Sequence, residues 1–230
     1  MSVLMPSLDP AISVLAPSFK AISITVEAAG VANPRIGTDA LDRASRSIAV
    51  AGAEWADDHL QEWAEVFRSF GAKPQRTPCS AEALRKRALR DGRLPSIDPV
   101  VDLYNAISIK YAVPVGGENL AAYVGVPKLT LADGTEPFDT MKDGAPAQES
   151  PEPGEVIWRD DEGVTCRRWN WRQGVRTRLS ADATQMWFIL ESLSAMPLGA
   201  LHEAGDRLAE GLQLLMHKAK IEKRLIGFGL

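Results

Sequence analysis

Cysteine and histidine are scarce in this sequence of 230 residues. Its two cysteines, Cys79 and Cys166, and its three histidines, His59, His202 and His217, form neither a disulfide framework nor a metal-ligand pattern. We therefore expect no metal and no other cofactor, and the cysteine usage favours a reducing, cytoplasmic compartment. We interpret His59 as a surface or boundary histidine without a chemical role.

Several motifs that would identify a function are also missing. There is no G-x-x-x-x-G-K, no G-x-G-x-x-G after a strand and no nucleophile elbow G-x-S-x-G. No apolar run reaches the ~20 residues that a membrane span needs. The first 20 residues lack a basic segment and are interrupted by Pro6, Asp9 and Pro10. These features argue against a P-loop or dinucleotide-binding enzyme, and we expect no membrane partner.

Charge of one sign does not dominate the chain, whose formal net charge is −4. Such a balance opposes non-specific coating of nucleic acid, and we expect no DNA partner, but a local basic patch can still bind RNA. A helix predicted from Ser80, as N-cap, to about Asp91 carries such a patch, formed by Arg85, Lys86, Arg87 and Arg90, with Arg93 just beyond. The pattern leaves two interpretations open, a solvated helix face and a contact with RNA phosphates.

What is present is the composition of an ordinary globular protein, 45% hydrophobic and 24% charged. Alternating or β-branched segments predict strands, which cover 19–28, 126–132, 155–159, 164–173 and 185–192. Apolar residues at helical spacing predict helices over 38–51, 54–70, 80–91, 98–112 and 199–223. Residues 133–155 show neither the helical nor the strand spacing of apolar residues, which predicts a long loop. The strand 185–192 is apolar on both faces except at Glu191, which is typical of a central strand.

The stretch from Leu94 to Gly117 contains the strongest candidate for a site. Asp98 and Pro99 predict the start of a helix, which ends near Ala112, and the pair Gly116-Gly117 predicts a turn. Three polar residues share one side of this otherwise apolar helix, namely Asp102, Asn105 and Ser108. We interpret the helix side and the turn as the wall and the floor of a site.

Glu191 is the second candidate, because a carboxylate in an apolar strand needs a partner. Either it pairs with an arginine such as Arg168 or Arg172, or it faces a pocket; the sequence leaves both open. The two arginines belong to the segment RRWNWR, residues 167–172, in which arginine and tryptophan alternate. That pattern fits a half-buried strand with tryptophan inside, and it also fits a surface that stacks and holds RNA.

Four segments in this order resemble a known family. The segments LPSIDPVVDLYN, the following P-x-G, LADGTEPFDTMKDG and FILES resemble the B3/B4 editing domain of the bacterial phenylalanyl-tRNA synthetase β subunit. The RRWNWR segment is similar to one in free-standing proteins built from this module. The resemblance covers about 93–215 and implies an α+β fold with mixed β-sheets covered by helices. We expect a single domain, 1–230, with a core at about 80–220 and an N-terminal strand-helix extension at about 1–79.

The resemblance also implies an activity. The synthetase module hydrolyses the ester of tyrosine wrongly attached to phenylalanine tRNA, so the implied partner is a tRNA with its aminoacylated 3′ end. Asn105 matches the helix asparagine of the family, and Glu191 matches the strand glutamate that helps to recognise the misattached amino acid. The family's histidine in the loop after the helix corresponds to Gly116 here.

From these matches we expect three groups of site residues. The catalytic group is Asn105 with Gly116 and Gly117, whose backbone N–H groups would stabilise an oxyanion. Glu191, Asn105 and Ser108 would bind the substrate. The RNA-binding group would be Arg85, Lys86, Arg90, Arg93, Arg168 and Arg172.

The sequence thus predicts a trans-editing hydrolase that deacylates a mischarged tRNA. The synthetase's catalytic core is missing from this sequence, so by this resemblance the chain does not itself charge a tRNA. A non-catalytic module that binds a tRNA end or an amino acid is the alternative. A structural scaffold is a third hypothesis, and it requires Glu191 to be paired with an arginine in the absence of a pocket. The oligomeric state, the tRNA and the amino acid are left open.

Overall fold

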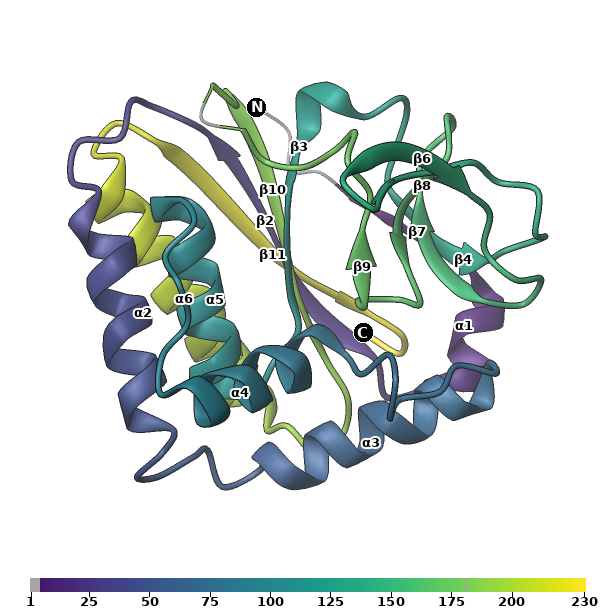
Figure 1. Cartoon of the computed structure of the whole chain (residues 1–230), viewed down its shortest axis with the longest axis horizontal. Helices are drawn as coiled ribbons and strands as arrows, with labels where there is room; N and C mark the ends of the chain where they lie inside the picture. Colours follow the sequence, from purple (N-terminus) through teal and green to yellow (C-terminus); the bar gives the residue numbers. More distant parts are fainter. Residues whose placement is uncertain (1–4, 181) are drawn as a thin grey trace.

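The computed structural model describes residues 5–180 and 182–230, which form an α+β fold with mixed sheets covered by helices, as predicted (Figure 1). One sheet has four strands in the order β11–β2–β10–β3, with the bounds Lys220–Gly227, Lys20–Glu27, Gln185–Ser192 and Val115–Asn119. A second has five strands in the order β1–β4–β7–β8–β9, with the bounds Ser7–Leu8, Lys128–Leu131, Val156–Arg159, Val164–Arg167 and Arg172–Gln173. The only parallel pairing described is that of β1 with β4.

Helices cover the four-stranded sheet on one side and run along the bottom of the molecule in Figure 1. Their bounds are α1 Pro10–Leu15, α2 Arg35–Ser47, α3 Ala56–Ser69, α4 Ser80–Asp91, α5 Pro99–Tyr111 and α6 Leu198–Leu215, with a short 3₁₀ helix at Leu120–Ala122. Within the described residues, none of these helices is long and apolar enough to cross a bilayer.

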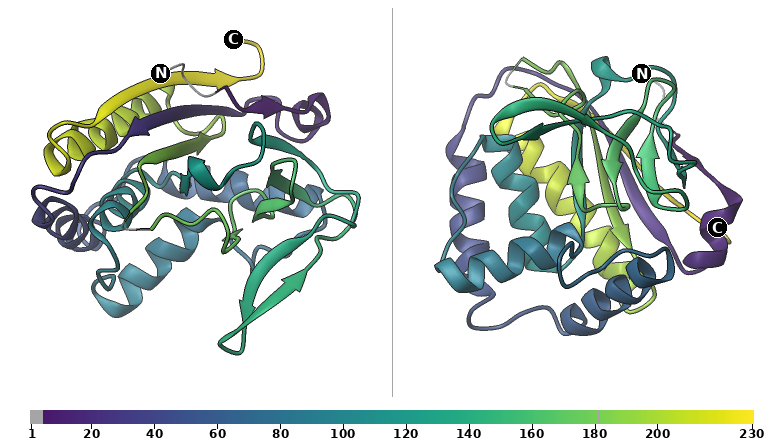
Figure 2. Two further views of the ribbon diagram at one scale, coloured as in Figure 1. Left: turned by 90° about the horizontal axis from the view of Figure 1, so that it is seen from above. Right: turned by 45° about the vertical axis from the view of Figure 1, so that its right-hand side comes forward.

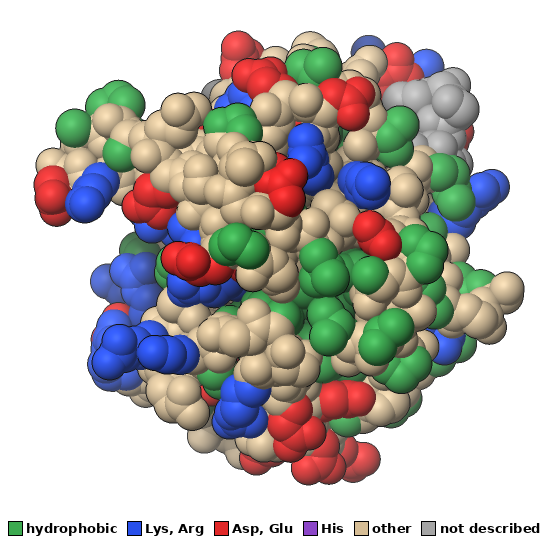
Figure 3. Space-filling view, turned by 90° about the vertical axis from the view of Figure 1, so that its right-hand side faces the viewer, with side chains coloured by type: hydrophobic (Ala, Val, Ile, Leu, Met, Phe, Trp, Pro, Cys, Tyr) green, Lys and Arg blue, Asp and Glu red, His purple; other side chains and the backbone are tan. Residues whose placement is uncertain are grey.

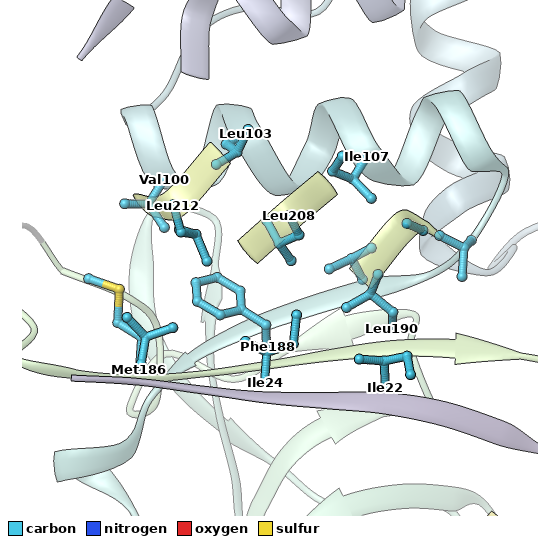
Figure 4. Close-up of a cluster of buried hydrophobic side chains, with 14 of the residues drawn as sticks. Ile22, Ile24, Val100, Leu103, Ile107, Met186, Phe188, Leu190, Leu208 and Leu212 are labelled. Atoms are coloured by element: carbon cyan, nitrogen blue, oxygen red, sulfur yellow. The ribbon is translucent and has the colours of Figure 1, made fainter. Parts of the chain in front are cut away.

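Strand β10 is the interior strand that its apolar sequence predicts. On one face Met186, Phe188 and Leu190 pack against leucine and isoleucine side chains of α5 and α6 (Figure 4). The alternate residues Trp187, Ile189 and Glu191 point to the opposite face, because side chains in a strand alternate. Burial of a large apolar side chain contributes ~1.5–3 kcal/mol. The first face therefore fixes β10, and the second is left to form a site.

Helix α5 begins and ends as predicted. The Asp98 carboxylate accepts hydrogen bonds from the backbone N–H groups of Val100 (2.9 Å) and Val101 (3.4 Å), and Pro99 is the first helical residue. The helix stops at Ala112, which has the left-handed φ of 51°. The helix and its ends are therefore set by local sequence.

The double glycine does not form the predicted turn. Gly116 and Gly117 lie inside β3, opposite Ile189 and Phe188 of β10. Glycine is required at position 117 by close packing, since a Cβ there would approach Tyr104 Cε1 to 2.9 Å and Phe188 Cε1 to 3.0 Å. The packing of α5 over the sheet, and not a change of chain direction, accounts for this residue.

Two other predicted elements differ from the structure. The predicted loop 133–155 contains a hairpin, β5 (Phe138–Lys142) and β6 (Ala145–Glu149), which projects from the body (Figure 2). Its two-residue turn, Asp143-Gly144, has φ of 52° and 80°, as a tight hairpin requires. The predicted helix 199–223 ends at Leu215, because the residues of β11 pair along the whole of β2.

The N-terminal residues contribute an interior strand. Strand β2, within the segment that we expected as an extension, lies between β10 and β11 and pairs with both over eight residues. Its face with Ile22, Ile24 and Val26 joins the core under α5 and α6. The prediction of a strand at 19–28 is confirmed.

His59 is buried on α3 and not at the surface or a boundary as predicted. Its Nε2 accepts hydrogen bonds from Trp63 Nε1 (3.1 Å) and Leu193 N (3.1 Å), so the ring proton is on Nδ1, which donates to Ala112 O (2.8 Å). The ring thus joins α3 to the end of α5 and to the residue after β10. Burial lowers the pKa of His59 below its usual 6.5.

We expect His59 to make stability depend on pH. A proton added to Nε2 would face two N–H donors, so the folded state holds the neutral ring and the unfolded state binds the proton first. The free energy of unfolding should therefore decrease as the pH falls below about 6.5, towards the lower pKa of the folded state.

Urea unfolding at pH 7.5, 6.5 and 5.5 measures this dependence. In His59→Gln the decrease between pH 6.5 and 5.5 should be smaller than in the wild type. The exposed His202 gives a matched control, and His202→Gln should retain the wild-type slope. Equal slopes in the wild type and in His59→Gln would contradict the assignment.

Candidate functional site

A cavity of about 280 Å³ lies between α4, α5, β3, β10 and the region β7–β9 with the turn between β8 and β9. Its walls are aromatic, formed by Tyr104, Trp158, Trp169, Trp171 and Trp187. Its polar groups belong to Ser80, Asn105, Glu118, Asn170, Gln173 and Glu191. Pockets for drug-sized ligands have volumes of ~300–1,000 Å³. The size of this one suits a ligand as small as an amino acid.

The floor of the cavity is the second face of β10 with the paired residues of β3. Glu118 lies opposite Trp187 and Gly116 opposite Ile189, and Glu191 follows at the end of the same row. Gly116 has no side chain, so the space above it between Glu118 and Glu191 stays open. A Cβ at Gly116 would meet only Ile189, at 3.3 Å.

Glu191 is held by three nitrogen donors, and none of them is an arginine. Its Oε1 accepts from Trp158 Nε1 (2.9 Å) and Trp169 Nε1 (3.0 Å), and its Oε2 accepts from Asn170 Nδ2 (3.0 Å). The side chain is 1% exposed, and burial raises its pKa to about 7 although these donors favour the charged form. Glu191 and Asn105 line one cavity. These facts exclude the scaffold hypothesis, which required an arginine partner and no pocket.

The donors of Glu191 come from a tight turn that interrupts the predicted strand 164–173. Strand β8 ends at Arg167, and the next two residues, Arg168 and Trp169, have left-handed φ of 46° and 63°. Such a conformation costs ~1–3 kcal/mol per non-glycine residue and is found at functional sites. Here it directs both Trp169 and Asn170 at the Glu191 carboxylate. The segment 167–172 is therefore not a regular strand with tryptophan side chains on its buried face and arginine side chains on its exposed face.

Arg167 fixes the start of this turn from inside the protein. Its guanidinium donates from Nε and Nη2 to the two carboxylate oxygens of Glu155 (2.9 and 2.8 Å) and from Nη1 to Glu149 (3.0 Å). The same Glu155 accepts from Arg168 N (3.0 Å). A buried bidentate pair of this kind defines the geometry of the chain on both sides.

Asn105 has a free side-chain amide at the cavity, and the backbone groups of Gly117 point away from β10. Among the described residues, the Asn105 side chain has no hydrogen-bond partner. Gly117 O accepts from Gln173 Nε2 (2.9 Å), so the carbonyl points away from β10, and the N–H of a strand residue points to the same side. The backbone N–H and carbonyl of Gly116 point towards β10 instead. Gly116 lies two residues after Pro114, whose carbonyl accepts a hydrogen bond from Glu191 N of β10, and backbone groups two residues apart in a strand point to the same side. We expected both glycines as backbone donors, but the N–H of Gly116 faces β10, and that of Gly117 lies on the edge of β3 that residues 177 and 178 border.

Ser108 and Arg85 lie away from the positions that we expected. Ser108 is fully buried and donates its hydroxyl to Val113 O (2.8 Å), outside the cavity. Arg85 is 8% exposed and donates to Ile109 O (2.6 Å), so it joins α4 to α5 and is not on the solvated face. Asp102 fixes the start of α5, since it accepts from Ile97 N (2.9 Å) and from the Ser96 hydroxyl.

The other expected basic residues of the α4 region are at the surface and do not line the cavity. Lys86, Arg90 and Arg93 are exposed on or beside α4, which contributes Ser80 and two apolar residues to the cavity wall. Ser80 is the first residue of α4 and not its cap, and its hydroxyl has no partner in the described chain. In a space-filling view, Lys and Arg side chains gather most densely along one edge of the face shown (Figure 3).

At the rim, the guanidinium groups of Arg168 and Arg172 lie 4.5 and 5.8 Å from the ring of Trp171. Arg172 also donates to Met141 O (3.0 Å) on the projecting hairpin. Both arginines therefore border the opening, where their expected contact with RNA remains a proposal.

The sequence interpretation missed Glu118. This carboxyl is 5% exposed, accepts a hydrogen bond from the Tyr123 hydroxyl, and has its pKa raised to about 8 by burial. Reading VGGEN as a strand instead of a turn would have placed Glu118 on the same face as Gly116. Burial raises the pKa of the Cys166 thiol, also in the cavity, so this cysteine is not an activated nucleophile.

Fold and site together define a class, an α+β domain with a cavity that is walled by tryptophan side chains and has two buried carboxyl groups on its floor. The model of the B3/4 domain family matches residues 62–198, more than half of the sequence, and the chain belongs to this family. This match confirms the B3/4-type domain that the resemblance predicted.

Among solved structures, it is similar to an N-terminal fragment of the phenylalanyl-tRNA synthetase β subunit from Pyrococcus horikoshii, with a TM-score of 0.51 and 10% identity. The similarity covers 96% of this chain and 50% of that fragment, so the chain spans half the length of its structural relative. At this identity the likeness concerns the fold. The comparison with curated proteins found no match.

Proposed function

We propose that this protein is a trans-editing hydrolase that binds the aminoacylated 3′ end of a mischarged tRNA in the cytoplasm and cleaves its ester bond. The observation that carries the proposal is the Glu191 carboxylate, held by three N–H donors at the floor of an aromatic cavity with free polar groups beside it. The relation to a subunit of a tRNA synthetase supports tRNA as the source of the ligand.

The available groups suit ester hydrolysis. The amino acid would lie over Gly116, with its side chain towards Glu191. The Asn105 amide would hold the attacking water or the ester carbonyl, and the Gly117 N–H would donate to the oxyanion that forms when water attacks. The exposed Lys86, Arg90 and Arg93 would contact the phosphates of the tRNA end.

The test is a deacylation assay with a panel of mischarged tRNAs, each compared with its spontaneous rate of hydrolysis. The proposal expects acceleration for at least one aminoacyl-tRNA. A panel without any acceleration would overturn the catalytic assignment.

Asn105→Ala should lower kcat about tenfold for the aminoacyl-tRNA that is cleaved. The reason is that one lost hydrogen bond in the transition state is worth up to ~1.5 kcal/mol, and 1.36 kcal/mol corresponds to tenfold. Asn119→Ala is a matched control, because Asn119 caps the short 3₁₀ helix after β3 and does not line the cavity. An unchanged kcat in Asn105→Ala would remove Asn105 from the site.

A non-catalytic binding module is the second candidate. One observation favours it: no histidine lines the cavity within the described residues, and Gly116 stands at the position of the family's histidine. This candidate predicts binding of an amino acid or an aminoacylated tRNA end, shown by calorimetry or a thermal shift, without turnover.

A further inference from the structure

Glu118 belongs to the cavity but has no role in the function proposed above. The residues that line the cavity include two buried carboxyl groups, those of Glu118 and Glu191, and no lysine, arginine or histidine among those that the structure places there. Buried charges are normally paired, because an unpaired charge is costly in a dry interior. Glu118 has neutral hydrogen-bond donors in Tyr123 and Gln173, and Arg176 acts on it from outside the cavity lining. A ligand with positive charge would supply the cation that the lining itself does not.

An unpaired acceptor beside Glu191 points to the same kind of ligand. Asn170 is 8% exposed and lines the cavity. The orientation of the Asn170 amide is fixed, since Nδ2 donates to Glu191 Oε2. The flipped amide would place its oxygen, an acceptor, against a carboxylate oxygen, which also can only accept. Its Oδ1 is consequently the buried atom that has no hydrogen-bond partner in the described chain. A buried polar atom of this kind needs a donor, which a bound ligand can supply.

The two carboxyl groups lie at opposite ends of an open floor. Glu118 is level with Trp187, and Glu191 is four residues further along β10, which at ~3.3 Å per residue separates the two Cα levels by ~13 Å. Gly116, between them, leaves room for a ligand. The indole of Trp187 beside Glu118 adds an aromatic surface that attracts cations.

We propose that Glu118 is a ligand-binding carboxyl, which accepts hydrogen bonds from a primary ammonium group of the amino-acid ligand, while Glu191 and Asn170 accept from a donor at its other end. The proposal rests on the amino-acid site described under the proposed function. The ammonium group can be the α-ammonium or that of a basic side chain, and the two sources are separable by acetylation of the α-nitrogen.

Proton release is the signature of such binding. Burial raises the pKa of Glu118 to about 8 and that of Glu191 to about 7, so both carboxyls are partly protonated at pH 7. A cation favours their charged forms and lowers these pKa values, so binding releases protons. Among the other groups that face Glu118, the pKa values of Tyr104, Cys166 and Arg176 are raised and that of Asp160 is lowered. Tyr123 and Arg178 also lie beside Glu118.

The experiment is calorimetric titration at pH 7 of the full chain with four amino-acid amides, which cannot be hydrolysed as esters. The amides are those of L-norleucine, L-lysine, N-acetyl-L-norleucine and Nα-acetyl-L-lysine. In the wild type, an amide with the required ammonium should bind about tenfold more tightly than its acetylated form, as expected for a charge-assisted hydrogen bond. If Nα-acetyl-L-lysine amide still binds, the side chain supplies the ammonium.

Glu118→Gln keeps the shape of the side chain and removes its charge. This variant should lose about tenfold in affinity for the ammonium ligands and bind N-acetyl-L-norleucine amide as the wild type does. The control is Glu210→Gln, an exposed site outside the cavity with the same change of charge. Thermal unfolding confirms that the variants are folded. Repeating the wild-type titration in two buffers of different ionisation enthalpy measures the released protons without any substitution.

The outcomes separate this proposal from the hydrolase assignment. Ammonium-dependent binding with proton release but without deacylation supports the role of Glu118 and rejects the hydrolase. Deacylation of a mischarged tRNA with equal amide affinities in the wild type and Glu118→Gln rejects the role of Glu118 and retains the hydrolase. Absence of amide binding, or binding without proton release, overturns the role of Glu118.

Discussion

Glu191→Gln is expected to lower kcat/KM for deacylation of the mischarged tRNA about 10- to 100-fold. The glutamine is nearly isosteric, but it removes the negative charge that faces the ligand. Hydrogen bonds to a charged group contribute ~1.5–3 kcal/mol, which gives that range at 1.36 kcal/mol per tenfold. Single-turnover deacylation by the wild type and the variant measures the effect.

The fold of Glu191→Gln should survive. A glutamine Oε1 can accept from both indoles, and its Nε2 can donate to Asn170 if the Asn170 amide turns its free Oδ1 towards it. Glu210→Gln, which changes an exposed carboxylate, should keep the wild-type rate. If Glu191→Gln deacylated as fast as the wild type while remaining folded, the carboxylate would have no part in the reaction.

Arg167→Met should lower the free energy of unfolding by ~3–5 kcal/mol, the cost of breaking a buried ion pair by removal of one partner. Methionine fills similar space but leaves the buried Glu155 carboxylate with backbone N–H donors and the partly exposed Arg168 guanidinium, whose Nε lies 3.7 Å away. The turn at Arg168-Trp169 loses its anchor, so Trp169 should move from Glu191. Urea unfolding measures the stability, and near-ultraviolet circular dichroism reports on the tryptophans.

A matched control and a second substitution distinguish charge from packing. Arg207→Met removes an exposed pair with Glu210 and should leave the free energy of unfolding nearly unchanged. The double variant Arg167→Met with Glu155→Leu removes both buried charges and should be more stable than Arg167→Met alone. A loss below ~1 kcal/mol in Arg167→Met would show that the pair does not hold the turn.

The helices were predictable because their signals are local. Asp98 and Pro99 begin α5 where the sequence places them, and the apolar run of β10 gives an interior strand. The turn predicted at Gly116-Gly117 was wrong, because glycine is common both in turns and where two elements approach closely. The choice between these depends on Tyr104 and Phe188, which lie far away in sequence. The prediction that the last helix continues past Leu215 was wrong for a similar reason, since residues 220–227 pair with β2 and form the strand β11.

The candidate site was predictable in part. Asn105 and Glu191 were identified from the sequence, and the structure brings both to one cavity. Ser108 and Arg85 share the spacing of exposed polar residues, yet both are buried against backbone carbonyls of the α5 region. Helical spacing relates residues within one helix, and it does not state which side faces a neighbouring element.

The sequence by itself determined the α+β class, the boundaries of α5, the interior strand β10 and the family, because these depend on short-range patterns and on motif order. Only the tertiary structure decided the partners of Glu191, the left-handed turn at Arg168-Trp169 and the presence of Glu118 in the cavity. Each of these depends on contacts between strands distant in sequence. A buried carboxyl is defined by the groups that surround it, and those groups meet only when the chain is folded.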